Sequence, residues 1–439
     1  MEKTYITGWI IQPTKGEEKI NNKKLIILLG ILGLLMFSAF TPKVIAQQST
    51  VDWSPTFHHD LRHSGYSTST GPLTNQTLWS YQTDNSVEYT SPAVVNGVVY
   101  VGSHDHFVYA LNAATGSKIW GFQTGDSVEG SLSVVHGVLY VGSNDHYIYA
   151  LNAETGSKIW SFRTGNSVYS CPAVDNGMVY VGSNDHYVYA LNAESGIKIW
   201  SYDAGNFVWS SPAVANGVVY VDSYDNVYAL ETATGNKIWS YASSDLYSSP
   251  TVVNGVVYFG SGDHYVYALN AATGSKIWGF QTGDSVESSP AVANGVVYVG
   301  SNDRSVYALD AASGSKIWSY KTGDSVNSCP FVVNAVVYVG SEDNNVYALN
   351  AATGSKIWSY TTGSEVESSP SVANGVVYVG SDDNCVYAFG SISVPQPSPP
   401  LPSPTIPEIG PTTIIVALIV VTTTLLLLKR VVKTKNCYC

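Results

Sequence analysis

Positive charge is scarce in this sequence. The segment 47–390 holds 11 Lys and Arg against 29 Asp and Glu, a formal charge of −18, within a chain of 439 residues. Such a surface repels phosphate backbones and anionic lipid headgroups, which excludes nucleic acid as a partner. Charged residues make up only 12% of the chain, whereas hydrophobic residues make up 45% and aromatic residues 12%. This composition excludes a disordered chain and is sufficient for a large core.

Cysteine is rare, and the short motifs of several enzyme classes are missing. Of five cysteines, only Cys171, Cys329 and Cys385 lie in the segment 47–390. They form no disulfide framework, so packing must supply the stability. The sequence has no Gly-x-Ser-x-Gly nucleophile elbow, and "TGSK" lacks the upstream glycine of a phosphate loop. These absences argue against a hydrolase and against a nucleotide-binding enzyme.

An apolar run near the N-terminus predicts export. Residues 25–40 are apolar, two lysines precede them, and Val44 and Ala46 have the small-residue spacing of a signal peptidase site. We therefore predict a signal peptide over residues 1–46. The 24 residues before the run are a long lead. They leave open that the true start lies downstream or that the segment remains as an anchor.

The C-terminal end predicts a membrane anchor. Residues 412–428, "TTIIVALIVVTTTLLLL", would form a helix about 26 Å long, close to the ~30 Å hydrocarbon core of a bilayer. The basic tail 429–439 follows at once and belongs in the cytoplasm. Prolines make residues 391–411 a semi-rigid stalk. We expect a cell-surface protein with one membrane pass and everything before residue 412 outside. This end resembles the sorting signals of archaeal surface proteins, which implies that a lipid replaces the helix.

A repeat of about 40 residues fills the segment between these ends. The undecapeptide "ALNAATGSKIW" occurs at 110–120, 268–278 and 348–358, with variants between. Its Trp recurs every 39 to 41 residues, at Trp79, Trp120, Trp160, Trp200, Trp239, Trp278, Trp318 and Trp358. Each period contains four short runs rich in Val, Tyr and Ile, separated by Asn-Gly and Thr-Gly turn signals. A repeated four-stranded antiparallel meander of this length is typical of a β-propeller blade.

The number of strands predicts eight blades. The "VYAL" strand occurs eight times, but the first Trp strand, residues 78–82, precedes any complete blade. The last copy, "VYAF" from Val386, has no Trp strand after it. Pairing of 78–82 with the last three strands removes both unpaired edges. We therefore predict an all-β, eight-bladed propeller over residues 78–390, closed by this N-terminal strand, after a lead-in segment at 47–77.

The repeated motif resembles the tryptophan-docking motif of the PQQ-like repeat family of quinoprotein-type propellers. The resemblance rests on Ala110, Asn112, Thr115, Gly116 and Trp120, which recur with this spacing from Trp79 to Gly390. It implies that each Trp docks on the next blade. Residues 52–67 also resemble the lead-in of outer-membrane assembly lipoproteins. As alternatives, the resemblance implies a quinoprotein dehydrogenase with pyrroloquinoline quinone and Ca²⁺, or a scaffold for envelope assembly. The vicinal Cys pair and "CxxCH" segment of such dehydrogenases are absent.

One face of the propeller breaks the repeat symmetry. The strands of a blade alternate in direction, so the connections between them alternate between the two faces of the propeller. The Asn-Gly and "NAATGS" turns fall on one face, where the sequence is nearly identical in every blade, and the "GSNDH" and "TGDSVE" loops fall on the other. The blades differ in the residue that stands three positions before the Pro at the start of each blade's first strand. An aromatic arc of Tyr169, Trp209 and Tyr247 is predicted to face an arc of Glu88 or its neighbour Tyr89, Glu129, Glu287, Asn327 and Glu367. This arrangement at the channel mouth suits a sugar or a cationic ligand. The alternative is that these residues only fill gaps between blades.

Other polar clusters have structural explanations. Four Asp-His pairs, such as Asp145-His146, are too far apart to share a metal ion, and His58, His59 and His63 have no Cys or Glu partner. Cys171 and Cys329 lie in the same repeat column on opposite sides of the channel, so we predict packed thiols without a bond. The prediction is a surface binding scaffold for a glycan, a cationic ligand or a protein. No catalytic residue, metal or cofactor is expected, and pyrroloquinoline quinone with Ca²⁺ is the alternative.

Overall fold

The computed structural model describes residues 54–68, 70–245 and 247–390. The predicted signal peptide 1–46, stalk 391–411, membrane helix 412–428 and tail 429–439 lie outside these residues. Within the described part of the chain, no helix is long and apolar enough to cross a bilayer.

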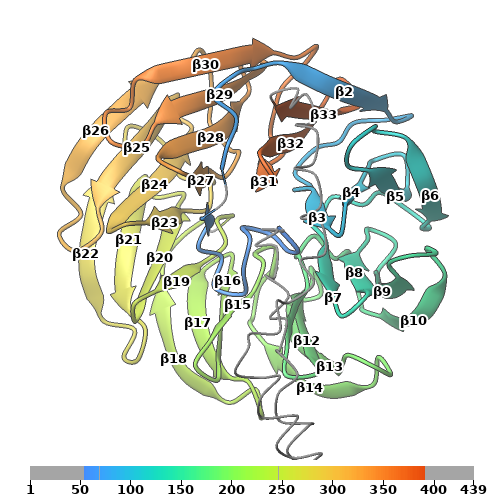
Figure 1. The fold of residues 1–439 in the computed structure, drawn as a ribbon. Helices are drawn as coiled ribbons and strands as arrows, with labels where there is room; N and C mark the ends of the chain where they lie inside the picture. Colours follow the sequence, from blue (N-terminus) through green and yellow to red (C-terminus); the bar gives the residue numbers. More distant parts are fainter. Residues whose placement is uncertain (1–53, 69, 246, 391–439) are drawn as a thin grey trace, which may run out of the picture. The chain divides into compact units, whose positions relative to one another are not determined.

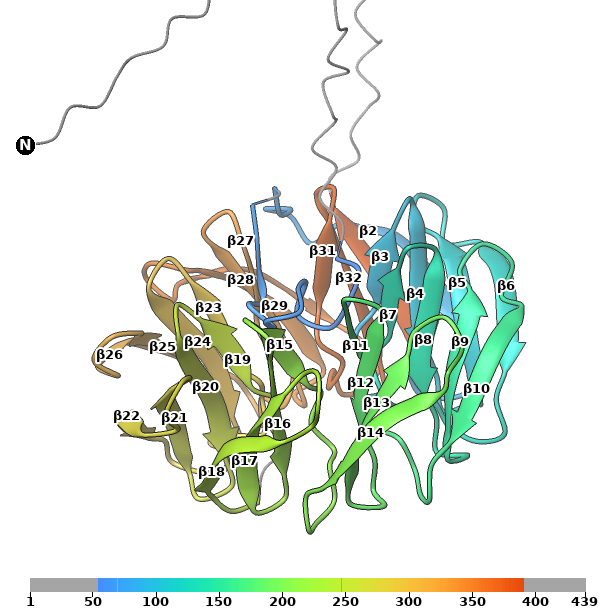
Figure 2. The same ribbon diagram turned by 90° about the horizontal axis from the view of Figure 1, so that it is seen from below.

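The described residues form eight sheets, each with four antiparallel strands, arranged as the blades of a disc (Figures 1 and 2), and one sheet gains a fifth strand from the lead-in segment. Blade 1 contains β3 (Ala93–Val95), β4 (Val98–Gly102), β5 (Phe107–Asn112) and β6 (Lys118–Gln123), and blade 2 contains β7 (Ser133–Val135), β8 (Val138–Gly142), β9 (Tyr147–Asn152) and β10 (Lys158–Arg163). Blade 3 contains β11 (Ala173–Asp175), β12 (Met178–Gly182), β13 (Tyr187–Asn192) and β14 (Lys198–Asp203), and blade 4 contains β15 (Ala213–Ala215), β16 (Val218–Ser223), β17 (Asn226–Glu231) and β18 (Lys237–Ala242). Blade 5 contains β19 (Thr251–Val253), β20 (Val256–Ser261), β21 (Tyr265–Asn270) and β22 (Lys276–Gln281), and blade 6 contains β23 (Ala291–Ala293), β24 (Val296–Ser301), β25 (Ser305–Asp310) and β26 (Lys316–Lys321). Blade 7 contains β27 (Phe331–Val333), β28 (Val336–Ser341), β29 (Asn345–Asn350) and β30 (Lys356–Thr361), and blade 8 contains β31 (Ser371–Ala373), β32 (Val376–Ser381), β33 (Cys385–Gly390) and the early strand β2 (Thr77–Gln82).

The predicted closure is confirmed. Strand β2 pairs antiparallel with β33, with Trp79 opposite Ala388 and Tyr81 opposite Val386. Figure 1 shows β2, from the start of the propeller, beside the last strands of the chain. The eighth blade is thus assembled from both ends of the repeat segment, and its outer strand comes from the N-terminal side.

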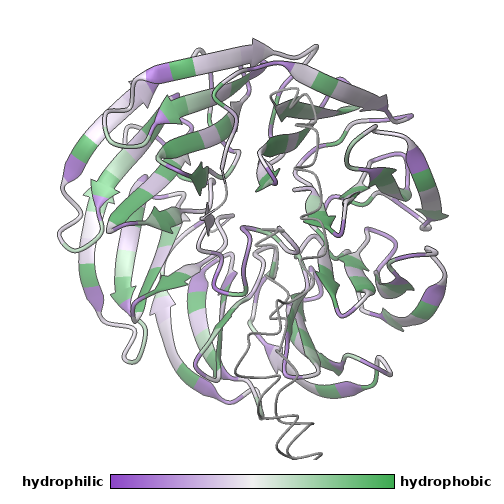
Figure 3. Cartoon of the chain, in the orientation of Figure 1, coloured by the Kyte–Doolittle hydropathy of each residue, from purple (hydrophilic) through white to green (hydrophobic). Residues whose placement is uncertain are grey.

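The predicted strands and turns follow from local sequence. The inner strands are short apolar runs, and Figure 3 shows hydrophobic colour concentrated on the inner strands and polar patches on the outer ones. The turn between β3 and β4 is Asn96-Gly97, with φ of 51° and 77°. Both residues have positive φ, as the favoured tight hairpin turn requires. These turns lie beside the "NAATG" turns on one face, since the Ala113 amide donates to the Gly97 carbonyl.

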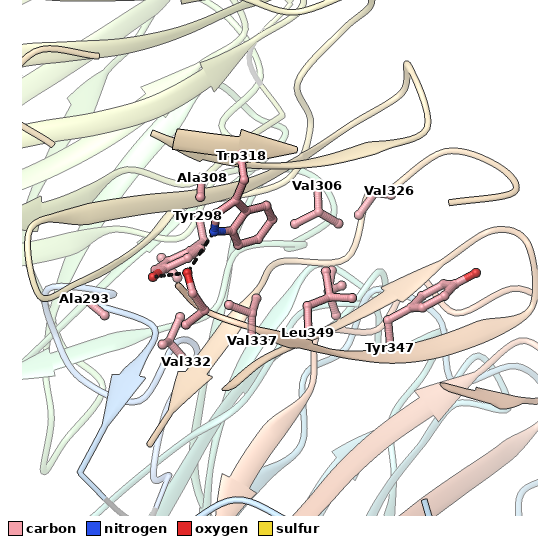
Figure 4. Close-up of a cluster of buried hydrophobic side chains, with 13 residues drawn as sticks. Ala293, Tyr298, Val306, Ala308, Trp318, Val326, Val332, Val337, Tyr347 and Leu349 are labelled. Atoms are coloured by element: carbon pink, nitrogen blue, oxygen red, sulfur yellow. Dashed lines mark hydrogen bonds between the residues drawn. The ribbon is translucent and has the colours of Figure 1, made fainter. Parts of the chain in front are cut away.

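The repeated Trp residues join neighbouring blades, as predicted. Trp318 of β26 is buried against blade 7, among Val332, Val337 and Leu349 (Figure 4). Its Nε1 donates a 2.8 Å hydrogen bond to the Ala351 carbonyl, which also accepts from the Tyr298 hydroxyl. The same carbonyl position accepts from the Trp of the preceding blade at six other joints.

The glycine of the motif makes room for the indole. At Gly116 φ is +71°, and a Cβ built there would stand 2.7 Å from the Trp79 ring. A larger residue would be strained and would push the ring away. Asn112 fixes the same turn, because its Oδ1 accepts from the amides of Ala114 and Thr115, each at 3.0 Å.

The lead-in segment lines the inside of the channel, which the sequence did not predict. Strand β1 (Tyr66–Ser67) pairs parallel with the inner strand β27. Backbone carbonyls before it accept hydrogen bonds from one equivalent Val amide in each of six blades, with the pairs Ser54–Val94, Pro55–Val134, Leu61–Val214, Arg62–Val252, Ser64–Val292 and Gly65–Val332. Because the inner strands have unpaired edges toward the channel, this segment satisfies them and ties six blades together.

Candidate functional site

Two rings of side chains surround the mouth of the channel on the face opposite the Asn-Gly turns. The inner ring has one residue per blade, three before the first strand's Pro position: Tyr89, Glu129, Tyr169, Trp209, Tyr247, Glu287, Asn327 and Glu367. The outer ring follows the second strand: His104, Asn144, Asn184, Tyr224, Gly262, Asn302, Glu342 and Asp382. Backbone bonds between loops hold the two together, as where the Asn144 amide donates to Ser127.

The inner ring lines one cavity of about 360 Å³. Seven of the eight residues singled out from the sequence line it, from Glu129 around to Glu367. In blade 1 Tyr89 lines the cavity, whereas Glu88 is not among the lining residues. Phe57 of the lead-in segment also lines the cavity, together with five serines and Cys329.

The aromatic side is a packed cluster centred on Trp209. Its ring stacks with Tyr247, with centroids 4.8 Å apart, and with Phe207 at 5.7 Å. Tyr169 and Tyr224 meet it edge-on at 6.4 Å and 6.1 Å. These contacts fix the indole, while Tyr247 and Phe207 remain 40% and 38% exposed. Phe207 and Tyr224 were not predicted from the sequence. Phe207 departs from a repeat column that has Ser in five blades, whereas the column of Tyr224 varies from blade to blade.

The opposite side carries carboxyl groups in a tight group. Oxygens of Glu88, Glu367 and Asp382 lie within 4.8 Å of one another, so this trio has the geometry to hold a metal ion. Burial and the neighbouring carboxylates raise the pKa of Glu367 to about 8 and that of Asp382 to about 7. His104 Nε2 lies 3.4 Å from Glu88 and 3.7 Å from Glu129. Burial also raises the pKa of Glu129 and Glu287.

Inner and outer ring residues pair within a blade. The amide nitrogen of Asn144 donates to Glu129 at 2.5 Å and that of Asn302 to Glu287 at 3.0 Å. Blade 7 has the reverse arrangement, in which Asn327 donates to Glu342 at 2.6 Å. Each bond orients its amide group and leaves the Oδ1 atom without a partner. The buried atoms that have no hydrogen-bond partner in the described structure include the Oδ1 atoms of these three Asn residues, Asn184 Oδ1, Asp382 Oδ1 and the Trp209 Nε1 donor.

The Asp residues of the Asp-His loops make structural contacts. Asp145 Oδ2 accepts from the Gly125 amide at 2.6 Å and from the Tyr149 hydroxyl at 2.7 Å, and Oδ1 accepts from the Tyr147 amide. These bonds hold the loop of one blade against the connection that leads into that blade from the blade before it. His146 follows with a φ of 72°. Equivalent Asp residues make the same Oδ2 contacts in other blades.

The lead-in histidines and the two buried cysteines also pack the interior. Burial lowers the pKa of His58 to about 3 and of His63 to about 4, and both rings pack against Phe57. Cys171 and Cys329 are free thiols in one cluster with Phe57. They take part in a ring of blade-to-blade bonds, in which the Cys171 amide donates to Ser211 and the Ser289 amide to Cys329 Sγ. The prediction of packed, unbonded thiols is confirmed.

Solved structures with the same fold include a BamB protein, an alcohol dehydrogenase and a computational design. BamB from Moraxella catarrhalis is 20% identical over 72% of this chain and 99% of its own, with a TM-score of 0.63. The quinohemoprotein alcohol dehydrogenase of Comamonas testosteroni is 18% identical over 77% of this chain and 80% of its own, with a TM-score of 0.67. The computationally designed Ika8 protein is 16% identical over 72% of this chain and 100% of its own, with a TM-score of 0.65. At these identities the likeness shows the fold alone.

Similarity of the sequence itself places the chain in a family. No curated protein matches it significantly. One family model, described as outer membrane protein assembly factor BamB, matches residues 65–144, 104–245, 204–321 and 326–391. These matches cover most of the chain and agree with the repeats and the blade joints. The chain therefore belongs to the BamB-like family of PQQ-repeat β-propellers.

Proposed function

We propose that this protein is a surface-anchored binding scaffold that holds a small polar ligand, a glycan or a cationic compound, at the mouth of its channel. The observation that carries the proposal is the division of one cavity into an aromatic side around Trp209 and a carboxyl side around Glu367. Aromatic faces opposite hydrogen-bonding carboxylates suit both ligand classes. Anchoring by residues 412–428 and display outside the cell belong to the same proposal.

Symmetry supports a binding role over gap filling. At positions where the fold alone determines the residue type, all blades have the same residue, as at the eight docking Trp positions. At the mouth the inner ring instead contains four aromatic residues, three Glu and one Asn. The three blades with Tyr169, Trp209 and Tyr247 are consecutive, so the departures from symmetry are grouped. A ligand bound by one cavity requires such a grouping, whereas the joints between blades do not.

A quinoprotein oxidoreductase is the alternative that the family suggests, but the lining residues do not fit its cofactor. Pyrroloquinoline quinone carries three carboxylate groups. The residues that line the cavity include three Glu and neither Lys nor Arg. Bringing a trianion against Glu129, Glu287 and Glu367 would cost electrostatic free energy. An envelope-assembly role, which the family description suggests, would use a protein-sized surface rather than this cavity.

Ligand titration of the full chain in detergent tests the proposal. A glycan array and calorimetric titration with ammonium compounds would compare the wild type with Trp209→Ala. We expect binding to the wild type and at least tenfold weaker binding to the variant. Ile199→Ala is the matched control, because Ile199 lies on the outer strand β14, away from the mouth, and is 52% exposed. Equal binding by wild type and Trp209→Ala, or no binding at all, would contradict the proposal.

A further inference from the structure

We infer that the ligand of the mouth cavity is an organic cation with several N–H donors, a primary polyamine or a guanidinium compound. This inference rests on the proposed function and narrows it to one chemical class. Three independent features of the cavity carry it: the balance of charge, the balance of hydrogen-bond donors and acceptors, and the position of the exposed aromatic rings.

The charge balance favours a cation. Carboxyl groups occupy five consecutive blades around the mouth, from blade 6 through blade 8 to blade 2: Glu287, Glu342, Glu367, Asp382, Glu88 and Glu129. Among the described residues, no Lys or Arg forms an ion pair with any of them, and His104 is the one basic group beside them. Glu367 is only 9% exposed, and its neighbours are Tyr89 and other carboxyl groups. Buried acids without counter-ions are costly unless a bound cation or a proton neutralises them.

The hydrogen-bond balance at the mouth favours a ligand with more donors than acceptors. The oxygens of Asn144, Asn302 and Asn327 are buried and unpartnered, and the bonds from their nitrogens to Glu fix them as acceptors. Asn184 Oδ1 and Asp382 Oδ1 add two more, against two unpartnered nitrogens, Trp209 Nε1 and His104 Nε2. Of these groups, Asn184, Asn327 and Trp209 line the cavity itself, and the others lie in the outer ring. A primary ammonium offers three donors and a guanidinium five, and neither brings an acceptor. A quaternary ammonium has charge but no donor, and a neutral sugar has donors but no charge to balance the carboxyl groups.

The aromatic side completes the site. Tyr247 and Phe207 are partly exposed, and each stacks with Trp209 beside the cavity. Their ring faces attract a cation, and the apolar carbons of an alkyl chain pack on them. The volume of about 360 Å³ lies at the small end of the range of about 300–1,000 Å³ for ligand pockets. The site therefore suits a small, flexible amine rather than a macromolecule.

Calorimetric titration of the full chain with four probes tests the inference. Spermidine and agmatine supply both charge and N–H donors, choline supplies charge alone, and trehalose supplies hydroxyl groups alone. At physiological salt we expect spermidine and agmatine to bind at least tenfold more tightly than choline, and trehalose not to bind. Glu367→Gln and Glu129→Gln should each weaken spermidine binding at least tenfold. Glu154→Gln removes the same charge from an exposed turn on the opposite face and should leave binding unchanged.

Each other outcome has a distinct meaning. If trehalose or array glycans bind and the amines do not, the binding scaffold stands and this inference fails. If choline binds as tightly as spermidine, the donor argument is wrong. If all Glu variants bind spermidine as the wild type does, the attraction is general and the inference is overturned. Tight Ca²⁺ binding that excludes spermidine would assign the Glu88, Glu367 and Asp382 trio to a metal. Binding of none of the probes or glycans removes the proposed function as well. Melting temperatures would show that each variant is folded.

Discussion

The indole Nε1 of Trp358 donates a 3.1 Å hydrogen bond to the backbone carbonyl of Pro72, 286 residues earlier in the chain. At the other seven joints the acceptor lies 32 to 34 residues later, in the turn of the next blade. The last blade has no such turn, because its outer strand β2 comes from the N-terminal side. Pro72 supplies the missing carbonyl and also accepts from the Tyr338 hydroxyl at 2.8 Å. Closure therefore depends on the segment just before β2 as well as on β2 itself.

This closure makes the first Trp as important as an internal one. Trp79 and Trp318 are 8% and 9% exposed, and each donates to a carbonyl of the next blade. We expect Trp79→Ala and Trp318→Ala to lower stability by similar amounts, about 3–5 kcal/mol at each joint. Urea unfolding followed by circular dichroism would measure both. A Trp79→Ala variant as stable as the wild type would show that β2 does not close the ring in solution.

Asp222 is a buried acid at a position where seven blades have glycine. It is fully buried, both carboxyl oxygens lack a partner, and burial raises its pKa well above the usual value. Because the folded state holds this proton more tightly than the unfolded state, the contribution of Asp222 to stability is greatest at low pH. That contribution is lost as the pH rises from about 4 toward the raised pKa. We expect Asp222→Gly to raise the melting temperature at pH 7.5 and to do so less at pH 4.

The reciprocal change is the matched control. Gly182 is the equivalent residue of blade 3, and a Cβ there would overlap Val208 of the next blade. Gly182→Asp should destabilise the protein at both pH values, since it adds an overlap as well as a buried acid. An unchanged melting temperature for Asp222→Gly at pH 7.5 would mean that the carboxyl group has a partner in solution.

The repeat made the fold predictable, and the same repeat pointed to half of the site. Repeat positions that hold the same residue type, such as Trp, Asn or Gly, predicted the blades, the joints between them and the closing strand, because each of these features depends on contacts that recur in every blade. Alignment of one variable column also gave seven residues that line the cavity. The outer ring was missed, although its signal is present: Glu129 and Asn144, Glu287 and Asn302, and Asn327 and Glu342 each pair at a spacing of 15.

The lead-in segment was not predictable in the same way. It has no repeat, and it is held by backbone carbonyls, which carry no sequence signature. Its passage through the channel depends on unpaired edges of six inner strands, and these exist only after the ring has closed. The position of Phe57 between Cys171 and Cys329 is a consequence of that assembly.

Phe57 protects the two interior thiols. Cys171 and Cys329 are 2% and 8% exposed, and burial raises the pKa of both. Thiolates are the reactive species, and the pKa of Cys385 is raised as well, by burial and by Asp383, so exposure distinguishes the three described thiols. Native protein should react with iodoacetamide at Cys385, which is partly exposed, and hardly at the other two. Peptide mass spectrometry assigns each site. Phe57→Ala should raise labelling of both interior thiols at least tenfold, with Leu73→Ala, an exposed lead-in residue, as the control. Rapid labelling in the native wild type would contradict this packing.

Amine binding should depend on pH through Glu367 and Asp382. Their pKa values of about 8 and about 7 mean that both are largely protonated at pH 6 in the free protein. They ionise as the pH rises, while the primary amines of spermidine stay protonated. The groups that face or adjoin this pair are Glu88, Glu342, Glu365, Asp383, Tyr89 and His104. A bound cation lowers both pKa values, so binding near pH 7 should release protons.

We therefore expect the affinity for spermidine to rise about tenfold from pH 6 to pH 8.5. Calorimetry at pH 7 in two buffers of different ionisation enthalpy would count the released protons. Glu367→Gln should flatten the pH profile and reduce proton release, because the group with the higher pKa is gone. Glu154→Gln should retain the profile of the wild type. Affinity that falls as the pH rises would have the wrong sign for a carboxyl site and would assign the dependence to another group.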